Sequence, residues 1–238
     1  MQFYIKPASG FTARMAKLAG RGERIPVSID GPYGDAFTAQ KLAEKEKVVL
    51  IAGGSGAGYL LPLLERLVRQ PRTGGSDVKV VIAVRHYETV GWAMEAIERI
   101  LSVQKEDASG VGKISVEIHV TDDVPAAPKA VVQDNASSSS ADAIHSTATD
   151  IEKNGTNTKT RTYSASSQKG IAVIEGKGRP DLKALIKNSA TGQRVGVTAC
   201  GPASMMLDVR NACAEAQRGI IARKIRGELW LHTESFSW

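Results

Sequence analysis

The strongest constraint on the fold is an alternation of short β-branched runs with amphipathic helical patterns between Lys47 and Trp238. Four of the five runs are nearly continuous in apolar character, as strands buried on both faces of a parallel sheet should be. The predicted strands are VVLIAG from Val48, VKVVIAV from Val78, ISVEIHV from Ile114, VGVTAC from Val195 and ELWLH from Glu228, and the predicted helices cover 58–69, 89–103, 180–187 and 202–217. The pattern predicts an α/β fold, a doubly wound parallel five-stranded sheet with helices on both faces.

The first predicted strand runs directly into a glycine-rich turn and a helix, GGSGAGYLLPLLERLVR. Glycines at such a turn let the backbone approach a pyrophosphate, and the helix N-terminus offers free N–H groups. The residues expected to form this cradle are Gly53, Gly54, Ser55, Gly56 and Ala57. Tyr59 occupies the place of the third glycine of G-x-G-x-x-G, and no Lys-Ser or Lys-Thr follows as in a P-loop. A tight structural turn is the alternative interpretation.

Basic residues follow the second predicted strand, which ends in AVRHYET. An NAD-specific domain usually carries an acidic residue there, whereas Arg85, with His86 beside it, suits the 2′-phosphate of NADPH. Arg179 in GKGRPD is a second candidate for this phosphate. The alternatives are a solvated strand end for Arg85 and His86, and an ordinary basic residue before a helix for Arg179.

Cys200 ends the fourth predicted strand, at the carboxyl edge where open α/β sheets bind ligands. Three roles remain open for it: a nucleophile with His232 as base, a small side chain packed beside a nicotinamide, or a core cysteine. The C-terminal segment GELWLHTESFSW adds Glu234 and bulky aromatic residues, which either pack on a core or cover a flat ligand.

Two segments depart from the alternating pattern. Residues 1–40 resemble the end of a larger domain, and residues 122–169 are rich in Ser, Thr and Asn and poor in apolar periodicity, which predicts a disordered insertion.

The four histidines are too scattered for a metal site. A net charge of +6 is spread along the chain without a basic block, so nucleic acid is not an expected partner. No run approaches the ~20 apolar residues of a membrane span, so the chain itself is expected to be soluble.

Five motifs in order, GPYG at Gly31, IAGGSGAGYLLPLL at Ile51, GRPD at Gly178, TACGPASMM at Thr198 and HTESFSW at the end, resemble the C-terminal half of the ferric reductase and NADPH oxidase family. The resemblance is greatest to the NAD-binding domain of fungal ferric-chelate reductases, and the fold is similar to the NADP-binding domain of ferredoxin-NADP reductase. It implies that residues 1–40 are a remnant of the flavin-binding β-barrel and that 41–238 form the NADP-binding domain.

The resemblance also implies a function. NADPH would reduce FAD on the cytosolic face of a membrane, and haem would be present only in the membrane domain of the parent reductase. The partners would be the FAD-binding and haem-bearing domains, and FAD would be held mostly by the former. Gly53 to Ala57 would hold the pyrophosphate, Arg85 and Arg179 the 2′-phosphate, and Cys200, Gly201 and Pro202 would lie by the nicotinamide. Phe236 would stack on the flavin, and we take Cys200, Glu234 and Phe236 as the candidate catalytic residues. A protein that binds NADP(H) without redox activity of its own is the alternative function.

Overall fold

The structure is a computed structural model of the 238-residue chain. It describes residues 5, 7–28, 36–69, 76–102, 111–122, 146–150, 159–164, 169–175, 179–190 and 193–235. The chain divides into two compact units, 1–36 and 37–238. The division falls close to the boundary after residue 40 that the sequence suggests.

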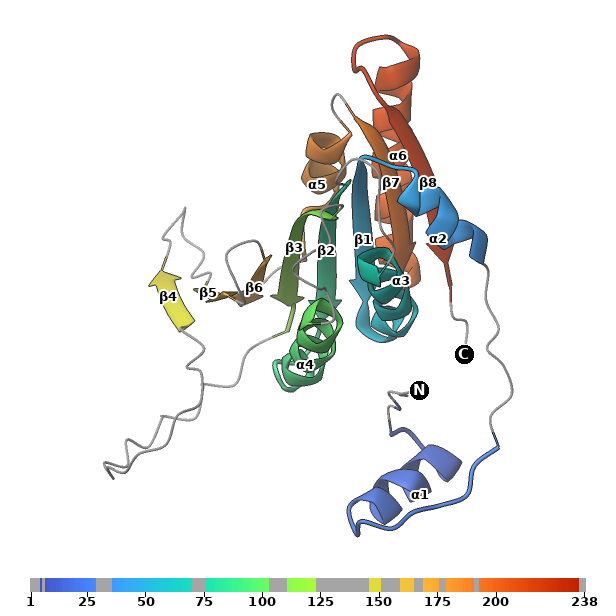
Figure 1. Cartoon of the computed structure of the whole chain (residues 1–238), viewed down its shortest axis with the longest axis vertical. Helices are drawn as coiled ribbons and strands as arrows, with labels where there is room; N and C mark the ends of the chain where they lie inside the picture. The colour runs from blue at the N-terminus through green and yellow to red at the C-terminus, as the bar shows by residue number, and fades with distance from the viewer. Residues whose placement is uncertain are drawn as a thin grey trace. The chain divides into compact units, whose positions relative to one another are not determined.

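The larger unit is an α/β domain built around one sheet (Figure 1). Its strands are β1 (Lys47–Gly53), β2 (Ser76–Val84), β3 (Val111–Val120), β4 (Ser146–Asp150), β5 (Lys159–Ser164), β6 (Lys169–Glu175), β7 (Arg194–Cys200) and β8 (Glu228–Glu234). Its helices are α2 (Ala36–Ala43), the 3₁₀ turn η1 (Gly54–Gly56), α3 (Ala57–Arg69), α4 (Glu88–Ser102), α5 (Leu182–Ser189) and α6 (Ala203–Ile221).

The sheet order is β4-β5-β6-β3-β2-β1-β7-β8, and all pairs from β6 to β8 are parallel. From β1 the chain builds outward through β2 and β3 to β6, and then returns to place β7 on the other side of β1. The strand order therefore reverses between β1 and β7. In open α/β sheets the carboxyl edge at such a reversal is where ligands bind.

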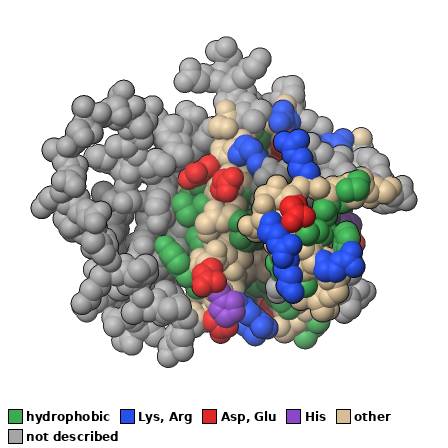
Figure 2. Space-filling model, turned by 90° about the horizontal axis from the view of Figure 1, so that it is seen from below, with side chains coloured by type: hydrophobic (Ala, Val, Ile, Leu, Met, Phe, Trp, Pro, Cys, Tyr) green, Lys and Arg blue, Asp and Glu red, His purple; other side chains and the backbone are tan. Residues whose placement is uncertain are grey.

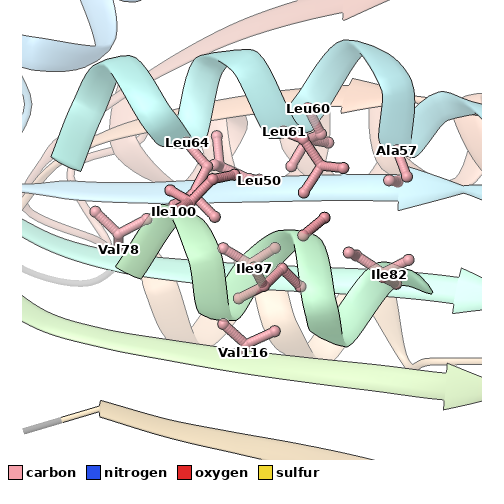
Figure 3. Close-up of a cluster of buried hydrophobic side chains, with 14 of the residues drawn as sticks. Leu50, Ala57, Leu60, Leu61, Leu64, Val78, Ile82, Ile97, Ile100 and Val116 are labelled. Atoms are coloured by element: carbon pink, nitrogen blue, oxygen red, sulfur yellow. The ribbon is translucent and has the colours of Figure 1, made fainter. Parts of the chain in front are cut away.

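Helices α3 and α4 cover one face of this sheet. Alternate residues of β1, β2 and β3 point to that face and form a single buried cluster with the apolar stripes of the two helices. Figure 3 shows Leu60, Leu61 and Leu64 of α3 and Ile97 and Ile100 of α4 directed onto these strands. This packing holds the amino end of α3 against the carboxyl end of β1.

Helices α5 and α6 cover the opposite face over β1, β7 and β8. The remaining alternate residues, including Val49 and Ile51 of β1 and Val195 and Val197 of β7, form a second buried cluster with Ile186 of α5 and Val209 of α6. Helices on both faces confirm the doubly wound prediction.

The short helix α2 lies against β7 on the α3 side. A Cβ on Gly196 would lie 2.8 Å from Leu42 Cδ2, so only glycine lets the helix approach so closely. The buried Lys45 amino group, just past the helix, donates to the Glu228 carboxylate at the start of β8. This ion pair joins the end of α2 to the edge of the sheet. Helix α2 is not among the helices predicted from the sequence.

The strand count predicted from the sequence is wrong in one respect. The parallel part of the sheet has six strands rather than five, because β6 is a sixth. Its sequence KGIAVIE has only a short apolar run and follows a polar segment, so the strand is not recognisable from the apolar pattern.

The segment 122–169, predicted to be a disordered insertion, contains two strands among its described residues, and the rest of it lies outside the described part of the chain. Strands β4 and β5 lie within it and pair antiparallel with each other and with β6. Polar composition limits only how much side-chain surface a segment can bury. A strand edge such as β6 also offers backbone hydrogen bonds, which Thr-rich segments with β propensity can use.

The smaller unit contains α1 (Gly10–Ala19). Phe11, Met15 and Leu18 lie at the i, i+4, i+7 spacing of an apolar stripe, and no residue of the helix is buried. The assignment of residues 1–40 to a flavin-binding barrel remains a prediction.

Candidate functional site

The candidate site lies at the carboxyl edge of the sheet, where β1 and β7 end side by side. Ala52 of β1 pairs with Cys200 of β7 in the parallel ladder, so both strands stop at the same level. Figure 2 views the molecule from the side to which the strand arrows of Figure 1 point, and a His side chain is visible there next to acidic and basic side chains.

Two turns meet at this edge, one after β1 and one after β7. A Cβ on Gly56 would lie 2.0 Å from the Cys200 carbonyl oxygen, and a Cβ on Gly53 would lie 2.7 Å from Pro202 Cδ. A Cβ on Gly201 would in turn lie 3.0 Å from the Gly53 nitrogen. The predicted cradle and the predicted nicotinamide-side residues are therefore in direct contact, and three glycines make that contact possible.

The outer part of the β1 turn is open. Gly54 has φ +56°, a conformation that favours glycine, and the place of its Cβ has no atom within 4 Å. Gly54 and Ser55 are exposed, whereas Gly56 and Ala57 are buried at the start of α3. Free N–H groups at the start of this helix are thus available beside open space, which fits the pyrophosphate of a dinucleotide.

Arg85 and His86 follow β2, the neighbour of β1. Gly53 pairs with Ala83 in the ladder, so Arg85 lies next to the glycine turn at the same edge. Both side chains are exposed, and within the described part of the chain neither forms an ion pair. An exposed guanidinium without a protein anion suits a ligand phosphate.

Arg179 is placed differently. It precedes α5, and its neighbours Pro180 and Asp181 line a cavity of about 320 Å³ between α5 and α6, with Asp208 and Asn211 on the other side. Arg179 is exposed. The structure does not bring it into contact with the glycine turn, so its role toward the 2′-phosphate remains a prediction.

Cys200 and Glu234 are brought together by the pairing of β7 with β8. Burial, together with a smaller effect of the negative charge of Glu234, raises the pKa of the Cys200 thiol to about 11. The thiol is therefore protonated near neutral pH, and the imidazole of His232 is stacked between two other rings. This geometry does not support a thiolate nucleophile with His232 as its base.

An aromatic row missed in the sequence analysis borders the site. The ring of His232 lies 6.3 Å from that of Tyr59 and 5.9 Å from that of Trp230, with its Nε2 3.5 Å from Glu234 Oε2. The Tyr59 hydroxyl is 3.4 Å from the buried Thr198 Oγ1, and burial raises the Tyr59 pKa, so the phenol is neutral. Tyr59 therefore links α3 to β7 and β8. Nothing in the sequence signals this contact except that Tyr59 replaces a glycine.

Some predicted features cannot be placed. Phe236, the candidate for flavin stacking, and the GPYG motif at Gly31 lie outside the described residues.

In the described ranges no group of three or more His, Cys, Asp or Glu side chains could hold a metal ion. No helix among the described residues is long and apolar enough to cross a bilayer.

Comparisons of sequence and of structure find the following similar proteins. Two Saccharomyces cerevisiae proteins, the ferric/cupric reductase transmembrane component 7 of strains YJM789 and ATCC 204508 / S288c, are each 28% identical over 246 residues. The alignments cover 100% of this chain and 38% of each relative, so the chain spans less than half of their length. A flavohemoglobin from Malassezia yamatoensis, solved with bound FAD and heme, aligns at a TM-score of 0.49 with 18% identity, over 99% of this chain and 43% of that one.

The family model described as the ferric reductase NAD binding domain matches residues 45–214, which include the glycine turn, Arg85, Cys200 and most of α6. This match covers well over half of the chain. With the reversal of strand order and the two turns in contact at the carboxyl edge, it shows that the chain belongs to the ferric reductase NAD-binding domain family.

Proposed function

We propose that the chain is the NADPH-binding module of a flavin-dependent ferric-chelate reductase. The observation that carries the proposal is the contact between the Gly53–Gly56 turn and the Cys200–Pro202 turn, beside an open helix N-terminus. This arrangement offers a place for the central pyrophosphate of an extended dinucleotide and a wall for its nicotinamide end.

The residues of this chain would bind and orient the cofactor. Backbone N–H groups of Gly54, Ser55 and Gly56 would donate to the pyrophosphate, and Arg85 would donate to the 2′-phosphate. Arg179 would be a second cation for that phosphate, and His86 would lie beside it. Each of these contacts uses a group that is exposed at or near the strand ends, with the exception of the buried Gly56.

The turn after β7 would form the wall on which the nicotinamide lies. Cys200 is neutral and only 1% exposed, so it would back this wall with a small polarizable side chain that brings no competing charge. Gly201 and Pro202 would continue this surface, and Glu234 would be the nearest carboxylate. Excluding water and fixing the ring are the contributions expected from the protein.

When bound, the nicotinamide supplies the hydride, and the redox chemistry belongs to the cofactors. We further propose that the acceptor is FAD held mostly by another domain, with Phe236 stacked on its ring. In the parent enzyme the electrons would then pass through a haem-bearing membrane domain to iron, with this module on the cytosolic face.

A calorimetric titration of the purified chain with NADP⁺ and with NAD⁺ tests the proposal. We expect saturable binding of both, with tighter binding of NADP⁺. Binding of neither would contradict the assignment of the cradle. NADPH-dependent reduction of added FAD or ferricyanide, measured against a heat-denatured control, then separates a redox module from a protein that only binds NADP(H).

A further inference from the structure

The pairing of β2 with β3 continues beyond the ends of both strands. The Thr121 backbone N–H donates to the Val84 carbonyl oxygen at 2.8 Å, and the Thr121 hydroxyl donates to the same oxygen at 3.1 Å. The Asp122 N–H then donates to the Arg85 carbonyl oxygen at 3.0 Å. Arg85, the candidate 2′-phosphate ligand, is thus joined directly to Asp122.

This junction brings two residues of opposite charge into neighbouring backbone positions at the binding edge. The side chains of Arg85 and Asp122 are both exposed, and in the described part of the chain neither forms an ion pair with the other or with any third residue. The Asp122 side chain also accepts no hydrogen bond from the described residues, in contrast to Asp77 at the opposite edge, which accepts one from Lys113 N at 3.0 Å.

The two charges suit different forms of one ligand. A guanidinium donates to a phosphate, whereas a carboxylate accepts hydrogen bonds from ribose hydroxyls and repels a phosphate. We infer that Asp122 is a specificity-determining residue that binds the adenosine ribose hydroxyls of NADH and weakens binding of NADPH, so that the module accepts both cofactors. The inference rests on the proposed function, because it requires the dinucleotide to lie across this edge.

Thr121 supports this arrangement as a positioning residue. Its hydroxyl and its N–H both bind the Val84 carbonyl oxygen, which holds the backbone of β3 against β2 immediately before the two charged residues. Without these bonds, the Asp122 N–H would be left as the hydrogen bond that joins the described residues after β3 to those after β2.

The test compares Asp122→Asn with a matched control, Asp77→Asn. The control makes the same change of charge on the same pair of strands, but at the amino edge, and keeps the oxygen that accepts from Lys113 N. Dissociation constants for NADP⁺ and NAD⁺ are measured by calorimetry at one fixed ionic strength, because exposed charges are screened by salt.

We expect Asp122→Asn to weaken NAD⁺ binding about tenfold, as loss of a charge-assisted hydrogen bond does, and to tighten NADP⁺ binding about threefold. The control variant should leave both constants unchanged. If the wild-type chain binds NADP⁺ but Asp122→Asn shifts both constants by less than about twofold, the inference is overturned and the proposed function stands. If the wild-type chain binds neither nucleotide, the proposed function itself fails.

Discussion

Gly56 lies so close to Cys200 that a Cβ at the glycine would be 2.0 Å from the cysteine carbonyl oxygen. The obstructing atom belongs to the backbone of a buried strand, so no side-chain rotation can relieve the contact. The backbone of the turn after β1 therefore packs directly against the backbone at the end of β7.

A Gly56→Ala substitution should force these two turns apart. We expect it to lower the free energy of unfolding by about 3 kcal/mol, the upper end of the usual cost of overpacking a buried site, and to abolish dinucleotide binding. Urea unfolding followed by circular dichroism measures the first effect, and calorimetry the second.

The matched control is Gly91→Ala, in the exposed interior of α4, where no atom lies within 4 Å of the added Cβ. Because alanine is the better helix former, this variant should be more stable by about 1 kcal/mol. Equal stability of the Gly56 variant and the wild-type chain would show that the turns are not in contact.

An Arg85→Ala substitution should weaken NADP⁺ much more than NAD⁺, because only NADP⁺ carries the phosphate that the guanidinium would bind. We expect a loss of about 30-fold for NADP⁺, from one charge-assisted contact, and little change for NAD⁺. Lys224→Ala removes the same charge at an exposed position just past α6 and serves as the control. Equal losses for both nucleotides would remove Arg85 from this role.

The sequence predicts the parallel strands and the carboxyl-edge residues well, because continuous apolar runs identify buried strands and parallel strands end at one edge. Gly53, Arg85 and Cys200 were found in this way. Contacts between elements far apart in the chain carry no such signal. The Tyr59 hydroxyl meets Thr198, which is 139 positions away, and the helix α2 depends on a glycine in β7.

Asp122 shows a different kind of error. The polar composition that begins at this residue assigned it to an insertion, although its backbone is still bound to β2. Composition indicates how much side-chain surface a segment can bury. It does not indicate at which residue the backbone pairing with an adjacent strand ends. A functional residue at the last point of strand pairing is therefore easily assigned to the loop that follows.

The Cys200 thiol should react slowly with alkylating agents. With its pKa near 11, about one molecule in a thousand carries the thiolate at pH 8, compared with roughly a quarter of an ordinary cysteine. Cys213, whose pKa burial raises to about 12, should be slower still. Mass spectrometry after iodoacetamide treatment should find both residues modified only in unfolding concentrations of urea. Rapid modification of Cys200 in the folded chain would restore the nucleophile hypothesis.

Glu117 should make the stability of the domain sensitive to acid. Its contacts with His119, 3.6 Å from the carboxylate, and with Lys79, 2.8 Å from it, hold its pKa at about 2 against the opposing effect of burial. Of the two contacts, the Lys79 contact is the one at hydrogen-bond distance. Because the pKa is lower in the folded state than the usual value near 4.3, folding is stabilised by the ionised carboxylate.

This contribution is fully present above about pH 4.5 and is lost as the pH falls toward 2, since protonating Glu117 removes both contacts. The wild-type chain should therefore lose stability between pH 4.5 and pH 2 more steeply than Glu117→Gln, which is already weaker at neutral pH and has no such proton to take up. Urea unfolding at a series of pH values measures both slopes. Glu95→Gln, on the exposed side of α4, should retain the wild-type slope. Parallel slopes for the wild-type chain and Glu117→Gln would mean that the ion pair on β2 and β3 does not stabilise the fold.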